Sequence, residues 1–97
     1  MAQQKTKQTT FVINPDVWAR ATAAAAAAGQ TTAGMIKADL LRVTAKGMLR
    51  IKETEPFPLA QSLRLPPLLV ERPAELEKES GLTQSQVIRR VIERVGS

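Results

Sequence analysis

The chain has 97 residues, which is enough for one domain or two very small ones. It contains neither cysteine nor histidine, so it lacks disulfides, thiolate nucleophiles, most kinds of zinc site and imidazole acid–base catalysis. The net charge is +5, with all of the excess in residues 1–50, so a polyanion is a natural partner. We expect no enzymatic activity, no metal and no other cofactor.

No apolar run reaches the roughly 18 residues that a membrane span needs. The first ten residues, "MAQQKTKQTT", lack the apolar core of a signal peptide. We therefore expect a cytoplasmic protein. A basic amphipathic membrane binder is the alternative, but the apolar stripes of the expected helices are needed for the core, so we expect no membrane partner.

The first expected element is a strand near residues 9–13. Apolar side chains stand at every second position of "TTFVIN", which is the period of a strand with one buried face. Phe11 and Ile13 share the inner face, and Thr10 and Val12 share the outer one.

A helix is expected next. Asn14 is a suitable N-cap, Pro15 fits the first helical position, and Asp16 suits the positive end of the helix dipole. The alanine tract continues this helix, because alanine is the best helix former. The positions that recur at helical spacing are Val17, Ala21, Ala24 and Ala28. Gly29 ends the helix by taking the left-handed conformation.

Thr31 then caps a second helix, expected over roughly Thr32–Lys46. Its apolar stripe consists of Ile36, Leu40 and Val43. Asp39 lies beside this stripe, and we expect it at the rim, reaching water or an arginine such as Arg20 or Arg72. Residues 47–59 follow as a linker, because two prolines and mixed charge suit an exposed connection.

The second half of the chain repeats the first at an offset of 52 positions without a gap. The identical pairs are Pro15/Pro67, Arg20/Arg72, Gly29/Gly81, Thr31/Thr83, Ile36/Ile88, Arg42/Arg94 and Val43/Val95. The repeat predicts a strand near residues 61–65 in "QSLRL", with Leu63 and Leu65 on the inner face and Ser62 and Arg64 on the outer one.

The helices of the second copy follow the same pattern. Pro73 lies on the apolar face of the first of them, so we expect a kink, or a helix that begins properly only near Arg72. Gly81 ends this helix. Thr83 caps the next one, over Gln84–Val95, and forms a capping box with Gln86. The apolar stripe of this last helix is Ile88, Ile92 and Val95.

The order strand, helix, Gly-x-Thr turn, helix occurs in "FVINPDVW…AGQTTAGMIKADLLRV" and again in "LRLPPLLV…SGLTQSQVIRRVIERV". It resembles the ribbon-helix-helix (Arc/MetJ) superfamily, and in particular its single-chain tandem members such as the TraY-type proteins. The resemblance implies a mainly α fold with a two-stranded antiparallel ribbon. Residues 1–97 would form one domain in which the repeats 8–46 and 60–96 make an intramolecular pseudo-dimer.

The resemblance also implies sequence-specific binding of double-stranded DNA, with the ribbon in the major groove. The base-contacting residues would be Thr10, Val12, Ser62 and Arg64. The phosphate-contacting residues would be Lys5, Lys7, Thr31, Thr32, Thr83, Gln84 and Ser85. Val12 is apolar, whereas members of this superfamily usually carry a polar or basic residue at this position. The alternative for the four ribbon residues is an ordinary solvated sheet face. The alternative for the residues at the helix starts is capping alone, and for Lys5 and Lys7 it is an N-terminal tail that only aids solubility.

The expected role is that of a transcriptional repressor or a plasmid transfer or partition accessory factor. Because the two halves differ, the DNA site is free to be asymmetric, and self-association on DNA remains possible. The alternative function is a protein-interaction module such as an antitoxin. The second helix is followed by little sequence that could wrap a toxin, which favours DNA binding.

Overall fold

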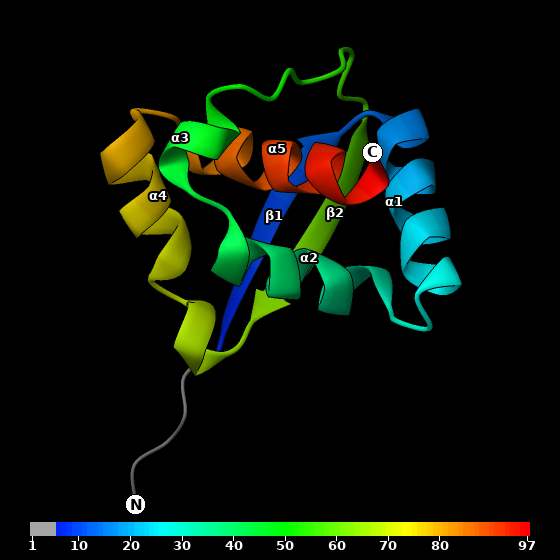
Figure 1. The fold of residues 1–97 in the computed structure, drawn as a ribbon, viewed down its shortest axis with the longest axis horizontal. Helices are drawn as coiled ribbons and strands as arrows, with labels where there is room; N and C mark the ends of the chain where they lie inside the picture. Colours follow the sequence, from blue (N-terminus) through cyan, green and yellow to red (C-terminus); the bar gives the residue numbers. More distant parts are fainter. Residues whose placement is uncertain (1–5) are drawn as a thin grey trace, which may run out of the picture.

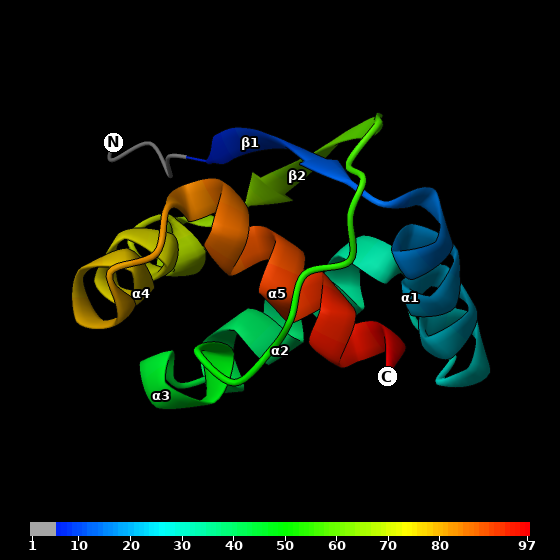
Figure 2. The same ribbon diagram turned by 90° about the horizontal axis from the view of Figure 1, so that it is seen from above.

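The computed structural model describes residues 6–97, and these residues form a mainly helical protein with a two-stranded antiparallel sheet (Figure 1). The sheet lies on one side of the molecule and the helices on the other (Figure 2). The elements in chain order are β1 (Lys7–Ile13), α1 (Pro15–Ala27), α2 (Thr32–Arg42), α3 (Ala45–Met48), β2 (Leu59–Leu65), the 3-10 turn η1 (Pro67–Leu69), α4 (Arg72–Ser80) and α5 (Gln84–Gly96).

The two strands pair antiparallel within the chain, with Thr10 opposite Ser62 at the centre of the sheet. Each strand begins two residues earlier than the sequence pattern indicated. The predicted alternation is confirmed, because the inner side chains are buried and the outer ones are exposed. The buried inner residues are Phe11, Ile13, Leu63 and Leu65, together with Thr9.

The core lies between this sheet and the crossing helices α2 and α5. Both predicted stripes are buried, Ile36, Leu40 and Val43 on one side and Ile88, Ile92 and Val95 on the other. Val87 and Val91 of α5 and Leu76 of α4 complete the contacts between the helices. One continuous apolar core therefore joins both halves of the chain.

The alanine tract is the second half of α1, as expected, but its buried face differs from the prediction. The buried positions are Val17, Ala21 and Ala25, whereas Ala28 is exposed in the turn after the helix. The small side chains let α5 approach closely. A Cβ added to Gly96 would lie 3.2 Å from the backbone nitrogen of Ala21. Alanine thus supplies helix propensity along the tract and close packing on one face.

The second helix is shorter than predicted. It ends at Arg42, and Val43 adopts an extended conformation, so the expectation of one helix to Lys46 is wrong. The hydroxyl of Thr44 accepts a hydrogen bond from the Gly47 N–H (3.0 Å) and thereby caps the separate helix α3. Threonine favours this capping role over a helix interior because its side chain competes for backbone groups.

Arg72 stabilises this break. Its guanidinium donates to the carbonyls of Leu40 (3.0 Å) and Val43 (2.6 Å), which would otherwise lack partners at the end of α2. The same residue opens α4, which confirms the expectation of a helix beginning near Arg72. Pro73 is then the second residue of α4, where a backbone N–H is not needed.

Asp39 does lie at the rim and does reach an arginine, but the arginine is Arg94 rather than Arg20 or Arg72. The Arg94 Nε donates to the carboxylate at 2.9 Å and 3.2 Å. Arg20 instead lies 3.8 Å from Glu93. The ion pair of Asp39 links α2 to α5 at the edge of the core.

The two helix-ending glycines have the expected conformation, with φ of 70° at Gly29 and 77° at Gly81. The threonines after them cap as predicted. Thr31 accepts from the Gly34 N–H (3.0 Å), and Thr83 forms a capping box with Gln86.

Replacing Gly81 with valine is expected to lower the free energy of unfolding by about 1–2 kcal/mol, because β-branched residues tolerate positive φ poorly. A Cβ built at Gly81 meets no atom within 4 Å, so the cost comes from the backbone alone. Urea unfolding monitored by circular dichroism measures it. Gly81→Asn is the control and should lose less, because asparagine adopts this conformation more readily. Equal midpoints for valine and glycine would contradict this account of the turn.

Candidate nucleic-acid interface

The outer face of the sheet carries a ladder of six side chains that point away from the core. The register places Thr10 opposite Ser62, Gln8 opposite Arg64, and Val12 opposite Ala60. All are exposed, and Val12 retains 40% of its accessible surface. The ladder therefore has a polar end formed by Gln8 and Arg64 and an apolar end formed by Val12 and Ala60.

This composition matches the chemistry of base edges in a DNA major groove. An arginine can donate two hydrogen bonds to guanine, and a glutamine can pair with adenine in the same way. Serine and threonine hydroxyls donate or accept, and valine or alanine can contact a thymine methyl group. The four predicted base-contacting residues thus lie together on one face.

Gln8 and Ala60 belong to this face, although the sequence pattern did not identify them. The predicted strands began at residues 9 and 61, one position too late to include them. Extending the alternation toward the start of each strand finds both. They also occupy equivalent positions in the two repeats, because they are 52 residues apart.

The guanidinium of Arg64 is free to meet an external ligand. It forms no hydrogen bond or ion pair with any residue among 6–97. Lys7 is also exposed, but its register position is that of the inner face, beyond the edge of the core. It therefore stands at the end of the sheet, whereas Lys5 lies outside the described residues.

The start of α5 lies beside the sheet. Gln84 Nε2 donates to the Thr9 hydroxyl across 3.5 Å. Figure 2 shows that α5 starts near the sheet and that its C-terminal end lies away from the sheet. Thr83 and Gln86 satisfy each other's backbone N–H groups. Within the described chain, the N–H groups of Gln84 and Ser85 lack such partners, so they can meet an anion.

The start of α2 is arranged differently. Thr31 caps the helix, and the Thr32 hydroxyl donates to the Thr22 hydroxyl (3.2 Å), which ties this end to α1. Thr31 is exposed and Thr32 is half-buried. The two predicted phosphate-binding ends therefore share their capping chemistry, but only the start of α5 has a hydrogen bond to the sheet among residues 6–97.

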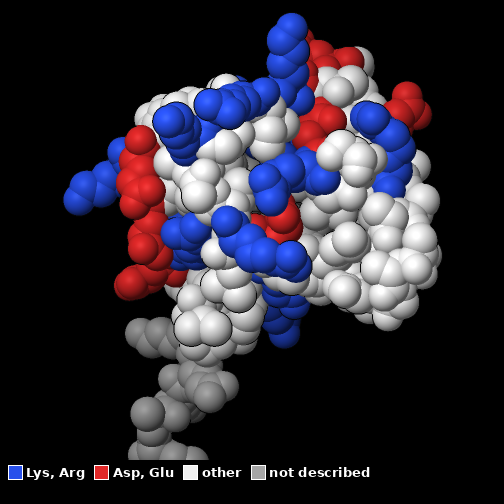
Figure 3. Space-filling view, in the orientation of Figure 1, with Lys and Arg blue, Asp and Glu red and all other residues white. Residues whose placement is uncertain are grey.

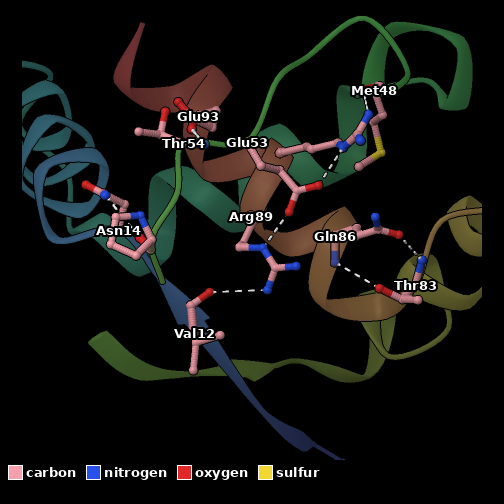
Figure 4. A network of polar contacts seen from close by, with 11 residues as sticks. Val12, Asn14, Met48, Glu53, Thr54, Thr83, Gln86, Arg89 and Glu93 are labelled. Carbon is pink, nitrogen blue, oxygen red and sulfur yellow. Dashed lines mark hydrogen bonds and ion pairs between the residues drawn. The ribbon is translucent and has the colours of Figure 1, made fainter. Parts of the chain in front are cut away.

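The segment between α3 and β2 is largely exposed, as expected, but polar contacts attach it to α5 (Figure 4). The carboxylate of Glu53 pairs with both Arg89 and Arg90. Arg90 also donates to the Met48 carbonyl (3.0 Å), and Arg89 stacks over the Phe57 ring at 4.1 Å. These contacts occupy both arginines with internal partners.

Two further hydrogen bonds hold the same segment. The Thr54 N–H donates to Glu93 (2.7 Å), and Asn14 Nδ2 donates to the Pro56 carbonyl (3.0 Å). Arg89 additionally reaches the Val12 carbonyl at 3.5 Å. The connection between the two halves is thus fixed against α5 and the end of β1. The sequence pattern indicated only an exposed linker.

In the described part of the chain, no group of three acidic side chains is placed to hold a metal ion. The helices of residues 6–97 are also too short or too polar to span a bilayer. In comparisons with known protein families, curated proteins and solved structures, none matches this chain.

Proposed function

We propose that this protein binds double-stranded DNA with sequence specificity by inserting the β1–β2 ribbon into the major groove. The carrying observation is the exposed ladder on the outer face, where Arg64 has no hydrogen-bond or ion-pair partner among residues 6–97. A two-stranded ribbon fits the dimensions of this groove. The buried inner face anchors the ribbon to the core, so the outer side chains are presented on a fixed scaffold.

The proposal includes an intramolecular pseudo-dimer of two ribbon-helix-helix repeats. The strand register supports it, because Thr10 and Ser62 are equivalent in the repeats and also pair with each other. A twofold axis through this pair would exchange Gln8 with Ala60 and Val12 with Arg64. Two short elements depart from this symmetry, because α3 occurs only in the first half and the 3-10 turn η1 only in the second.

Phosphate contacts complete the proposed interface. The free N–H groups at the start of α5 lie beside the ribbon, where the backbone of a bound duplex would pass, and helix N-termini attract anions. The proposed contacts are Thr31, Thr32, Thr83, Gln84, Ser85, Lys7 and Lys5. The net charge of +5 favours the same partner.

The polar and apolar ends of the ladder favour an asymmetric DNA site. Guanine and adenine are expected at one end, opposite Arg64 and Gln8, and thymine at the other, opposite Val12 and Ala60. We assign no catalytic role to any residue. A cytoplasmic repressor or a plasmid transfer or partition factor is the role that this form of binding serves.

Selection from a library of random duplexes tests the function. We expect an enriched asymmetric sequence that binds on the order of 10³-fold more tightly than a scrambled duplex, with affinity falling as salt rises. Fluorescence anisotropy over a salt series measures both properties. Absence of enrichment together with absence of salt-sensitive binding would overturn the proposal.

A further inference from the structure

At one end of the molecule, where α3 packs against α4, charges that form no ion pair among residues 6–97 are separated by sign. Figure 3 shows Asp and Glu gathered along α4, and Lys and Arg gathered over α3 and the neighbouring end of α2. This end is distinct from the outer face of the sheet, which points away from these helices in Figure 2.

The acidic set consists of Glu71, Glu75 and Glu79. Glu71 directly precedes α4, and Glu75 and Glu79 lie within it. The spacing of four residues places all three on one exposed side of the helix, which they share with the exposed Lys78. None of them forms an ion pair with another described residue. Leu68 adjoins this set with 80% of its surface exposed, and together with Glu71 and Glu75 it lines an open hollow.

The basic set consists of Arg42, Lys46 and Arg50, from the end of α2 to the residues just after α3. All three are exposed, and none pairs with an acidic group within residues 6–97. Leu41 and Leu49 flank this set and are 51% and 53% exposed. Each set therefore places three charges of one sign beside exposed leucine.

The two sets are held side by side. Arg72 at the start of α4 donates to the carbonyls of Leu40 and Val43 at the end of α2, so the helices that carry the sets are joined directly. Adjacent surfaces of opposite charge become self-complementary under a twofold rotation, because each contact then occurs twice.

We propose that a second copy of this chain docks at this end in a twofold homodimer. The acidic set of one protomer faces the basic set of the other, and the exposed leucines lie between them. Charge complementarity within the chain identifies the occupant, because a second copy supplies the opposite of each set. The dimer leaves the β1–β2 ribbon open, and the proposal does not depend on DNA binding.

Sedimentation equilibrium of the full chain without DNA tests this dimer. At about 50 mM salt we expect a monomer–dimer equilibrium, and at about 500 mM salt we expect dissociation, because screening weakens contacts between exposed charges. Two charge-reversed triple variants remove the complementarity: the first carries Glu71→Lys, Glu75→Lys and Glu79→Lys, and the second carries Arg42→Glu, Lys46→Glu and Arg50→Glu. Each alone is expected to raise the dissociation constant at least about tenfold.

Sedimentation of an equimolar mixture of the two variants is the decisive measurement. One variant then has two basic sets and the other two acidic sets, so we expect a heterodimer to form. Arg64→Ala is the matched control and should dimerise like the parent, since Arg64 lies on the outer face of the sheet. Circular dichroism checks that the variants are folded. If a triple variant does not fold, Leu68→Gln is the substitute and should also raise the dissociation constant.

Three results would overturn the proposal. The parent could remain monomeric at low salt, which would assign the basic set to another polyanionic or acidic partner. Dimers could persist unchanged in both charge-reversed variants. The folded variants could also fail to associate when mixed. Loss of DNA binding in the Arg64→Ala control would not bear on this interface, so the two proposals fail separately.

Discussion

Replacing Arg64 with alanine is expected to weaken binding to the selected DNA site about 5- to 150-fold, which corresponds to the 1–3 kcal/mol typical of a bidentate contact to guanine. Binding to scrambled DNA should change much less. The side chain lies between Leu63 and Leu65 and points away from the core, so its loss removes a contact to DNA without disturbing the fold. Anisotropy titrations of both duplexes measure the two effects.

Two comparisons separate base reading from simple charge. Arg64→Lys keeps the positive charge but cannot form the bidentate contact, so it should lose much of the specificity. Alanine at Lys7 and Lys5 should instead weaken binding to all sequences and flatten the salt dependence. All of these variants should keep nearly the parental thermal stability, because exposed substitutions usually change it little. An unchanged sequence preference in Arg64→Ala would show that the ribbon does not read DNA through this residue.

The parts of the fold that could be predicted are those specified by neighbouring residues. Alternation in "TTFVIN" and "QSLRL" indicated both strands and their buried faces. Gly29 and Gly81 marked the helix ends, because few other residues tolerate positive φ. The repeat at an offset of 52 residues indicated a second strand, and the resemblance to the ribbon-helix-helix superfamily implied that the two strands pair in one sheet, as the register confirms.

The errors arose where local signals compete. The apolar stripe of α2 continues to Val43, but Thr44 caps a new helix, and Arg72 satisfies the carbonyls at the end of α2. Arg72 is far from α2 in the sequence, so local spacing could not predict its hydrogen bonds to the end of that helix.

The candidate interface shows the same division. Thr10, Val12, Ser62 and Arg64 could be placed on one face by strand parity alone. Predicting Gln8 required the exact start of the strand, and sequence patterns specify strand boundaries less well than the presence of a strand.

The partner of Asp39 was also mispredicted. Asp39 pairs with Arg94, which is 55 positions away, so the sequence indicated an arginine partner but not which arginine.

Replacing Glu53 with glutamine is expected to lower the free energy of unfolding by about 2–4 kcal/mol, because it removes the one carboxylate shared by two largely buried arginines. The side chains of Glu53 and Arg89 each retain only 11% of their accessible surface, and that of Arg90 retains 16%. Glutamine keeps the size of the side chain but not its charge. Urea unfolding monitored by the fluorescence of Trp18, which packs against the core, measures the change.

Glu55 supplies the matched control, since it lies two residues further along the same segment, is exposed, and forms no ion pair with a described residue. Glu55→Gln should therefore change stability by no more than about 0.5 kcal/mol. Hydrogen exchange adds a local readout. The Thr54 N–H donates to Glu93 only while the segment lies against α5, so its exchange should accelerate in Glu53→Gln beyond the loss of global stability. If the two glutamine variants unfold at the same urea concentration, the arginines of α5 do not hold the connection, and the apolar core alone keeps the two halves together.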